Sequence, residues 1–121
     1  MARLVTEGFE FGDLLGASSY SGATISSSTV RTGSYSVYIN SGAKYIKFDI
    51  SDKSELYTRF GFYAGTQTAA HPIISFRNGS TNLVRILLSI SKALYMQVGT
   101  STAESEFYTL SDSVWYLIEV Y

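Results

Sequence analysis

The chain has no cysteine, a single histidine and a single proline among its 121 residues. Without cysteine it can form neither a disulfide bond nor a thiolate metal site. A zinc site needs several nitrogen or sulfur ligands, which one histidine cannot supply. Charged residues make up only 16% of the chain, below the roughly 25% of an average globular protein. We therefore expect no metal and no cofactor, and a fold stabilised by an apolar core or by neighbouring molecules.

The chain also lacks any concentration of charge. Nine basic and ten acidic residues are spread evenly and give a net charge of −1. Proteins that bind nucleic acid carry a basic patch, so we expect no nucleic-acid partner. The longest apolar stretch, 83–90, contains an arginine and is too short to cross a bilayer, so we expect no membrane partner. Near the start, Glu7, Glu10 and Asp13 interrupt the apolar run that a signal peptide needs.

What the chain has in plenty is aromatic residues, at 15%, including ten tyrosines and seven phenylalanines. Their spacing follows a period of two. In Tyr45–Ile50 the apolar Ile46, Phe48 and Ile50 alternate with more polar residues, and Leu56–Tyr63 repeats the pattern. This alternation is typical of strands with one face on a core and one face in water.

Other segments of the chain also read as strands. They are 4–11, 24–30, 35–39, 73–77, 83–90, 94–98, 106–110 and 114–121. Asn78-Gly79 is a strong hairpin signal between two of them, 65–71 reads as a loop, and the serine-rich 18–28 reads as a loop that runs into a strand. About ten short strands with turns at intervals of roughly 8–12 residues favour an all-β fold. We predict one domain over residues 1–121, a two-sheet antiparallel β-sandwich of the jelly-roll kind.

The final segment, 114–121, has the apolar composition of a central strand, and the sequence stops on it. A free terminus usually frays, and an uncovered apolar strand is exposed to pairing with other chains. We therefore expect a sandwich that is either incomplete at its C-terminal end or completed by neighbouring chains.

The sequence gives little support to two common catalytic arrangements, a Ser–His–Asp triad and a pair of carboxyl groups. A Ser–His–Asp triad would require His71, which we place in a polar loop. Glycoside hydrolases need two carboxyl groups at a fixed separation. Glu119 has no acidic residue at the alternate positions of its strand, and Glu104 and Glu106 have the spacing but flank a polar loop. We predict that the protein is not an enzyme and has no catalytic residue.

Two binding patterns have simpler explanations. Asp49, Asp52 and Glu55 could gather around a calcium ion, but their spacing is not that of an EF-hand loop, and a turn capped by Asp52 explains that residue equally well. Asn78-Gly79-Ser80 has the form of a glycosylation site, and it is better explained as a hairpin turn.

The aromatic residues on the polar faces remain as candidates for binding. Tyrosine and tryptophan offer a large, rigid contact area at low entropic cost. Such residues could form a protein interface or a platform for stacking sugars, or both faces of the sheet could be buried. The candidate contact residues are Tyr45, Tyr57, Tyr63, Trp115 and Tyr121.

Four segments resemble strands of a known family. Glu7–Leu14, Arg31–Val37, Glu55–Tyr63 and Trp115–Val120 are similar to strands of concanavalin A-like (laminin G-like) jelly-roll domains. The combination looks most like the version found in structural proteins of tailed bacteriophages. The acidic motif of the related glucanases is missing, which argues against hydrolysis.

This resemblance implies a non-enzymatic structural protein of the virion, assembled in the host cytoplasm. Such a protein would be a capsid decoration or head/tail accessory protein that contacts other virion proteins and forms a homo-oligomer. The alternative implied by the same resemblance is a carbohydrate-binding module of a tail or fibre protein, which would bind surface glycans during host attachment.

Overall fold

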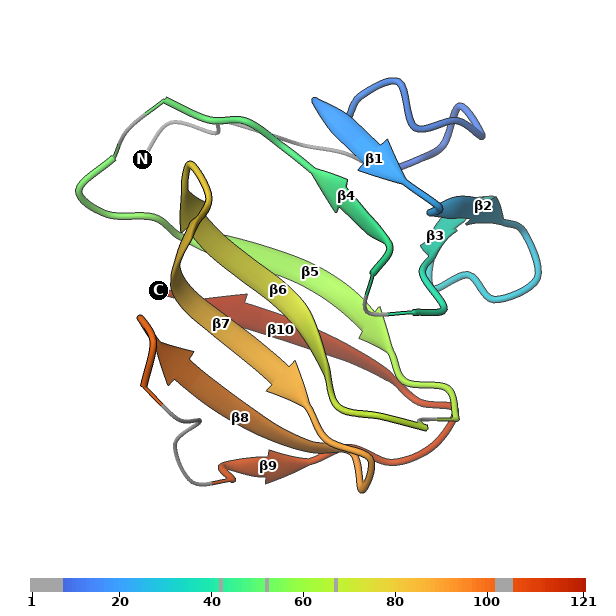
Figure 1. The fold of residues 1–121 in the computed structure, drawn as a ribbon. Helices are drawn as coiled ribbons and strands as arrows, with labels where there is room; N and C mark the ends of the chain where they lie inside the picture. The colour runs from blue at the N-terminus through green and yellow to red at the C-terminus, as the bar shows by residue number, and fades with distance from the viewer. Residues whose placement is uncertain (1–7, 42, 52, 67, 102–105) are drawn as a thin grey trace. The chain divides into compact units, whose positions relative to one another are not determined.

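The computed structural model describes residues 8–41, 43–51, 53–66, 68–101 and 106–121. These residues form ten β-strands and no helix, so none of the described segments is a helix able to cross a membrane. The chain divides into two compact units, one within Met1–Phe60 and Glu119–Tyr121 and the other within Gly61–Ile118. The prediction of an all-β chain is confirmed, and its several antiparallel sheets are consistent with a β-sandwich (Figure 1).

The first unit contains two short antiparallel ladders, β1–β4 and β2–β3. The strands are β1 (Ser19–Ser21), β2 (Thr24–Ser26), β3 (Ser36–Tyr38) and β4 (Tyr45–Lys47). Tyr20 pairs with Ile46, and Ile25 pairs with Val37. The three aliphatic residues of these pairs are half-buried, as expected for β-branched side chains on the inner face of a ladder.

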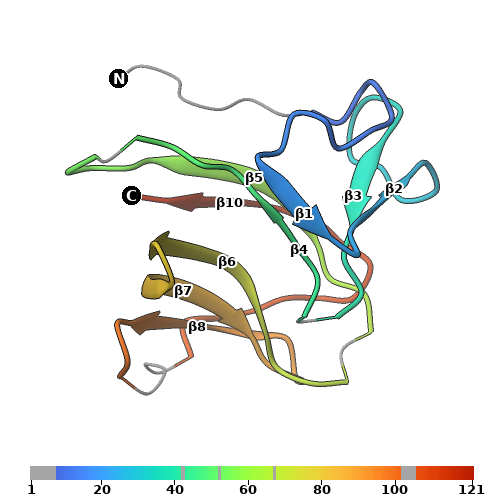
Figure 2. The same ribbon diagram turned by 45° about the horizontal axis from the view of Figure 1, so that its top comes forward.

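The second unit contains a four-stranded antiparallel sheet in the order β6-β7-β8-β9. The strands are β6 (His71–Asn78), β7 (Thr81–Leu88), β8 (Ala93–Val98) and β9 (Tyr108–Thr109). Figure 2 shows β6, β7 and β8 side by side. The hairpin predicted at Asn78-Gly79 is confirmed: Asn78 pairs with Thr81, and Gly79 has a φ of 57°, which glycine adopts without strain.

The core of this sheet lies on one face of β7. Ile86 and Leu88 alternate along the strand and are 5% and 1% exposed, and Leu88 pairs with Leu94 of β8, which is also buried. The buried hydroxyl of Ser89 accepts the backbone N–H of Ala93 at 2.9 Å. This bond closes the turn between β7 and β8 and satisfies the only polar side chain that is buried in the described chain.

β5 (Thr58–Tyr63) and β10 (Trp115–Val120) form a two-stranded sheet, and the unit boundary falls inside both strands. Their arrows run in opposite directions (Figure 1). We expected the segment 114–121 to be a central strand, but within the described residues β10 pairs with β5 alone.

Three local predictions were wrong. The predicted strand 4–11 lies partly outside the described residues, and residues 8–11 are not a strand. The N–H of Gly12 donates to the carbonyl of Phe9 at 2.9 Å, because the glycine allows a turn where the period of two suggested continuation. The segment 18–28, predicted to be a loop running into the strand 24–30, contains the additional strand β1, whereas β2 lies within the predicted strand. His71 begins β6 instead of ending a loop.

Candidate functional site

Two candidate residues of the first unit, Tyr57 and Tyr121, lie on either side of the Glu119 carboxylate. The hydroxyl of Tyr57 donates to Oε1 of Glu119 at 2.7 Å, and the hydroxyl of Tyr121 lies 3.5 Å from Oε2 of the same side chain. The two tyrosine rings are 4.9 Å apart between centroids and tilted by 43°. Glu119 is in β10, Tyr121 follows it by two positions on the same side of the chain, and Tyr57 directly precedes β5. We call these three residues the tyrosine–carboxylate cluster.

The cluster faces solvent and carries a negative charge. Tyr121 is 90% exposed, Glu119 is exposed, and Tyr57 is half-buried. The hydrogen bond to Glu119 raises the pKa of Tyr57 above its ordinary value of 10.0, with smaller contributions from burial and from the carboxylate charge. The phenol of Tyr57 therefore stays protonated and acts as a donor at neutral pH, which fixes the orientation of the carboxylate.

Two of the remaining candidates pair in the second unit. The rings of Tyr63, at the end of β5, and Trp115, at the start of β10, lie 5.4 Å apart and are tilted by 51°. Both side chains are half-buried. Tilted aromatic pairs at this distance contribute about 0.5–1.5 kcal/mol beyond the area that they bury, so this pair has a structural role whether or not it contacts a partner.

Tyr45 lies apart from the cluster. It is in β4, pairs with Ser21 and is 47% exposed. Within the described part of the first unit, no ring contact joins it to Tyr57 or Tyr121. The structure thus brings together Tyr57 with Tyr121 and Tyr63 with Trp115, and leaves Tyr45 as a single exposed ring.

A further phenol of the second unit has the opposite electrostatic environment. The backbone N–H of Ser111 donates to the phenol oxygen of Tyr116 at 2.8 Å, and the ring of Tyr116 meets Tyr108 edge-on at 6.2 Å. Hydrogen bonding from Ser111 lowers the pKa of Tyr116 below its ordinary value of 10.0, because a donor favours the ionised phenolate.

The structure also describes His71 and Glu106, which were considered for catalysis. His71 is half-buried at the start of β6, opposite Leu88. Glu106 accepts a hydrogen bond of 3.1 Å from the hydroxyl of Tyr95, and its sequence neighbour Glu104 lies outside the described residues.

The structure describes two of the three residues that were considered as calcium ligands. Asp49 forms an ion pair of 2.8 Å with Lys47, Glu55 is exposed, and Asp52 lies outside the described residues. Among the described residues, no three acidic or histidine side chains are grouped so that they could hold a metal ion.

Sequence reasoning considered Glu119 only as a catalytic acid and missed its two tyrosine partners. The signal for Tyr121 was present, since the two residues are two positions apart in the predicted strand 114–121. Tyr57 could not be found this way, because its contact depends on which strand pairs with which. Comparison of the chain with protein-family models, with curated proteins and with solved structures gave no match.

Proposed function

We propose that this chain is a non-enzymatic structural protein of a bacteriophage particle, a capsid decoration or head/tail accessory protein that works through protein–protein contacts. It would assemble in the host cytoplasm, reside in the virion and contact both other virion proteins and copies of itself. The observation that carries the proposal is the solvent-facing tyrosine–carboxylate cluster. The resemblance of the strand segments to phage jelly-roll domains supplies the biological setting.

The cluster has the properties of a protein-binding anchor. Tyrosine is enriched among residues that dominate interface energies, because its ring is large and has few rotatable bonds. The ring contact and the two bonds to Glu119 hold Tyr57 and Tyr121 in place before any partner binds. Less side-chain entropy is therefore lost on binding. The exposed carboxylate favours a partner surface that carries arginine or lysine.

The geometry around Glu119 favours a contact role. One oxygen of its carboxylate accepts the hydroxyl of Tyr57 at 2.7 Å, and the other faces the hydroxyl of Tyr121. Both carboxylate oxygens therefore face tyrosine hydroxyl groups of the same chain, which orients the side chain and suits a contact role.

The composition of purified particles tests this proposal. Quantitative mass spectrometry should find the chain at a fixed stoichiometry relative to the major capsid protein. Changing Tyr121→Ser should reduce incorporation, whereas Tyr38→Ser, at a tyrosine that is 55% exposed elsewhere in the first unit, should not. Absence of the chain from the particles, or an erratic stoichiometry, would count against the proposal.

A carbohydrate-binding module is the second candidate, and one observation favours it. Tyr121 is 90% exposed and lies beside the carboxylate of Glu119. Its ring could stack on a sugar while the carboxylate accepts hydrogen bonds from the sugar hydroxyl groups. A glycan array probed with the chain and with Tyr121→Ala tests it. This second function would be excluded by a lack of binding at millimolar sugar, or by binding that the substitution leaves unchanged.

A further inference from the structure

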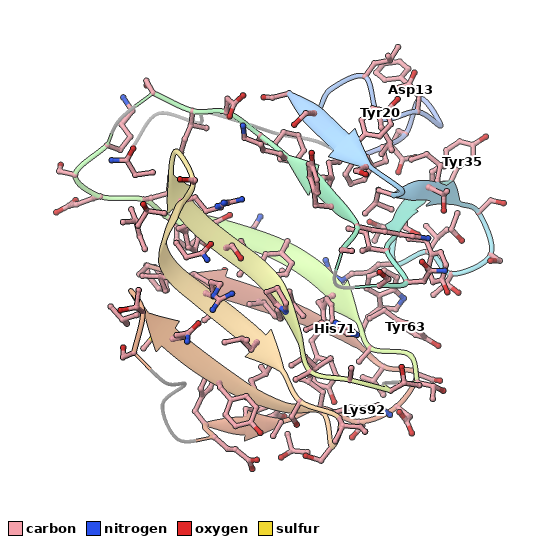
Figure 3. All side chains as sticks on the ribbon, in the orientation of Figure 1. Asp13, Tyr20, Tyr35, Tyr63, His71 and Lys92 are labelled. Carbon is pink, nitrogen blue, oxygen red and sulfur yellow. The ribbon has the colours of Figure 1, made fainter. Side chains whose placement is uncertain are left out.

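The turn between β6 and β7 places Asn78 directly before Gly79 at an exposed position. Asn78 is the last residue of β6, and Gly79 and Ser80 form the loop before β7; all three residues are exposed. Figure 3 labels His71 at the start of β6, and the turn lies at the opposite end of that strand. Asparagine is a chemically labile residue, and a following glycine has no side chain to shield its backbone nitrogen. The turn therefore holds an electrophilic amide next to an unhindered nucleophile.

The surroundings of Gly79 leave room for these two groups to react. Its φ is 57°, and a Cβ added at this position would have no heavy atom within 4 Å. The residue pairs of the β6–β7 ladder end with Asn78 opposite Thr81, so Gly79 lies in the loop, outside the ladder. Its backbone nitrogen is therefore neither crowded by a neighbouring side chain nor used in the pairing of the two strands.

The ladder next to the turn is interrupted. Its register shifts between Phe76 and Arg77, so two residue pairs, Arg77 with Asn82 and Asn78 with Thr81, lie between this irregularity and the loop. A register shift disrupts a ladder locally, and exposed ends of hairpins open at a low cost in free energy. The tip of the hairpin can therefore open, and the side chain of Asn78 can turn toward the next residue, while the buried part of β7 stays folded.

We propose that Asn78 is a site of spontaneous deamidation. The backbone nitrogen of Gly79 attacks Cγ of Asn78 and forms a C–N bond. The bond from Cγ to the side-chain nitrogen breaks, and that nitrogen leaves as ammonia together with the proton of the backbone N–H. Water then adds to either carbonyl carbon of the resulting succinimide ring and opens it to aspartate or isoaspartate. No atom is oxidised or reduced in these steps.

The other asparagines of the chain lack this combination of features. Asn40 is followed by a serine, and its Oδ1 accepts a hydrogen bond of 2.7 Å from Nζ of Lys44. Asn82 is followed by a leucine and is half-buried. A side chain on the following residue hinders attack by the backbone nitrogen of that residue. We therefore expect modification at Asn78 and neither at Asn40 nor at Asn82.

The modification changes both the charge and the backbone of the hairpin. Either product adds one negative charge to a chain whose net charge is −1. Isoaspartate also lengthens the main chain by one carbon at the residue that pairs with Thr81, so the last pair of the ladder is disrupted. Aspartate keeps the normal backbone. The isoaspartate form should therefore have the less stable hairpin of the two products.

Peptide mapping of the full chain by mass spectrometry tests the proposal. At mildly alkaline pH, which favours loss of the backbone proton, Asn78 should exchange its NH2 for OH at least about tenfold faster than Asn40 or Asn82. Fragment spectra are needed to separate two of these residues, because Asn78 and Asn82 both lie between Arg77 and Arg85 in one tryptic peptide. Labelling by an isoaspartyl methyltransferase should appear in the aged chain and not in the fresh one.

Two substitutions at this position separate the reaction from its consequence. Asn78→Gln should stay unlabelled, because its longer side chain would have to close a larger ring. Asn78→Asp carries the charge of the product on a normal backbone, so its urea midpoint should match that of the fresh wild type. The isoaspartate form, separated by chromatography, should unfold at a lower urea concentration than Asn78→Asp. Equal midpoints would refute the loss of the last ladder pair.

A synthetic peptide of residues 75–82 is the control for the incubation. The proposal is overturned if this peptide deamidates and the folded chain does not, because the hairpin would then protect Asn78. Equal rates at Asn40, Asn78 and Asn82, or methyltransferase labelling that persists in Asn78→Gln, would overturn it as well. The inference uses neither the tyrosine–carboxylate cluster nor the proposed function, so the failure of one leaves the other standing.

Discussion

The hydroxyl of Tyr57 donates a 2.7 Å hydrogen bond to Oε1 of Glu119, a residue 62 positions later in the sequence. This contact joins the segment before β5 to the end of β10 and orients the carboxylate between two tyrosines. It is the relationship on which the candidate surface depends, because it converts two separate exposed rings into one ordered cluster.

The titration of Tyr57 tests the strength of this contact. Because Tyr57 donates to a negatively charged acceptor, its pKa is raised above 10.0, and Glu119→Gln should bring it back toward that value. Ultraviolet absorbance of the phenolate, recorded for wild type and for Tyr57→Phe, isolates the contribution of this tyrosine. A titration that Glu119→Gln leaves unchanged would contradict the contact.

The same shift predicts how stability depends on pH. Because the folded-state pKa of Tyr57 is raised, its contribution is fully present below pH 10.0 and is lost as the pH rises through the folded-state value. The difference in urea midpoint between wild type and Tyr57→Phe should therefore be constant in the neutral range and shift against the wild type at alkaline pH. A difference that does not change above pH 10.0 would refute this linkage.

Tyr116 should behave in the opposite sense. Hydrogen bonding from the side chain and the backbone N–H of Ser111 lowers its folded-state pKa, so its ionised form is favoured in the folded protein. The resulting stabilisation is present above pH 10.0 and is lost as the pH falls through the folded-state value. Relative to Tyr116→Phe, the wild type should gain stability across this alkaline window. The hydrogen bond would be disproved by equal pH profiles for the two proteins.

Leu88 should be the most sensitive position in the core of the second unit. It is 1% exposed in β7, so Leu88→Ala should lower the free energy of unfolding by about 2–5 kcal/mol through lost burial and a residual cavity. The matched control is Leu83→Ala in the same strand, where the side chain is 48% exposed and the expected loss is below about 1 kcal/mol. Similar losses for both variants, measured by urea denaturation, would mean that β7 is not buried as described.

Gly33 should resist substitution for two separable reasons. Its φ of 77° strains any residue with a Cβ, and a Cβ there would overlap the carboxylate of Glu10. Gly99→Ala, at a φ of 61° in open space, should cost about 1–2 kcal/mol from strain alone, and Gly33→Ala should cost more.

Removing the carboxylate separates these two terms. In a Glu10→Ala background, the cost of Gly33→Ala in a urea denaturation series should fall to that of Gly99→Ala. An equal cost for Gly33→Ala with and without Glu10 would show that the carboxylate does not lie against this glycine.

The positions of many strands along the chain could be predicted, because they depend on local patterns. Alternation located β4 and β5, and Asn78-Gly79 located the hairpin between β6 and β7. β1 was missed because Ser19–Ser21 lacks apolar alternation and is a strand only through its pairing with β4. The segment 4–11 was predicted to be a strand, yet Phe9 has a φ of 58° and the chain turns there.

The candidate site was predictable in its residue types but not in its contacts. Alternation placed Tyr57 and Tyr63 on the polar side of one strand, and both are ordered by aromatic partners. Their partners come from β10 and the residue after it, so they depend on long-range pairing that no local pattern encodes.

We propose that the tyrosine–carboxylate cluster is a contact surface for virion proteins. A cryo-electron microscopy map of purified particles in which this chain can be placed tests it most directly. If the cluster is such a surface, Tyr57, Glu119 and Tyr121 will be covered by a neighbouring protein, with a basic side chain against the carboxylate. A map in which the chain is present and all three side chains still face solvent would contradict it.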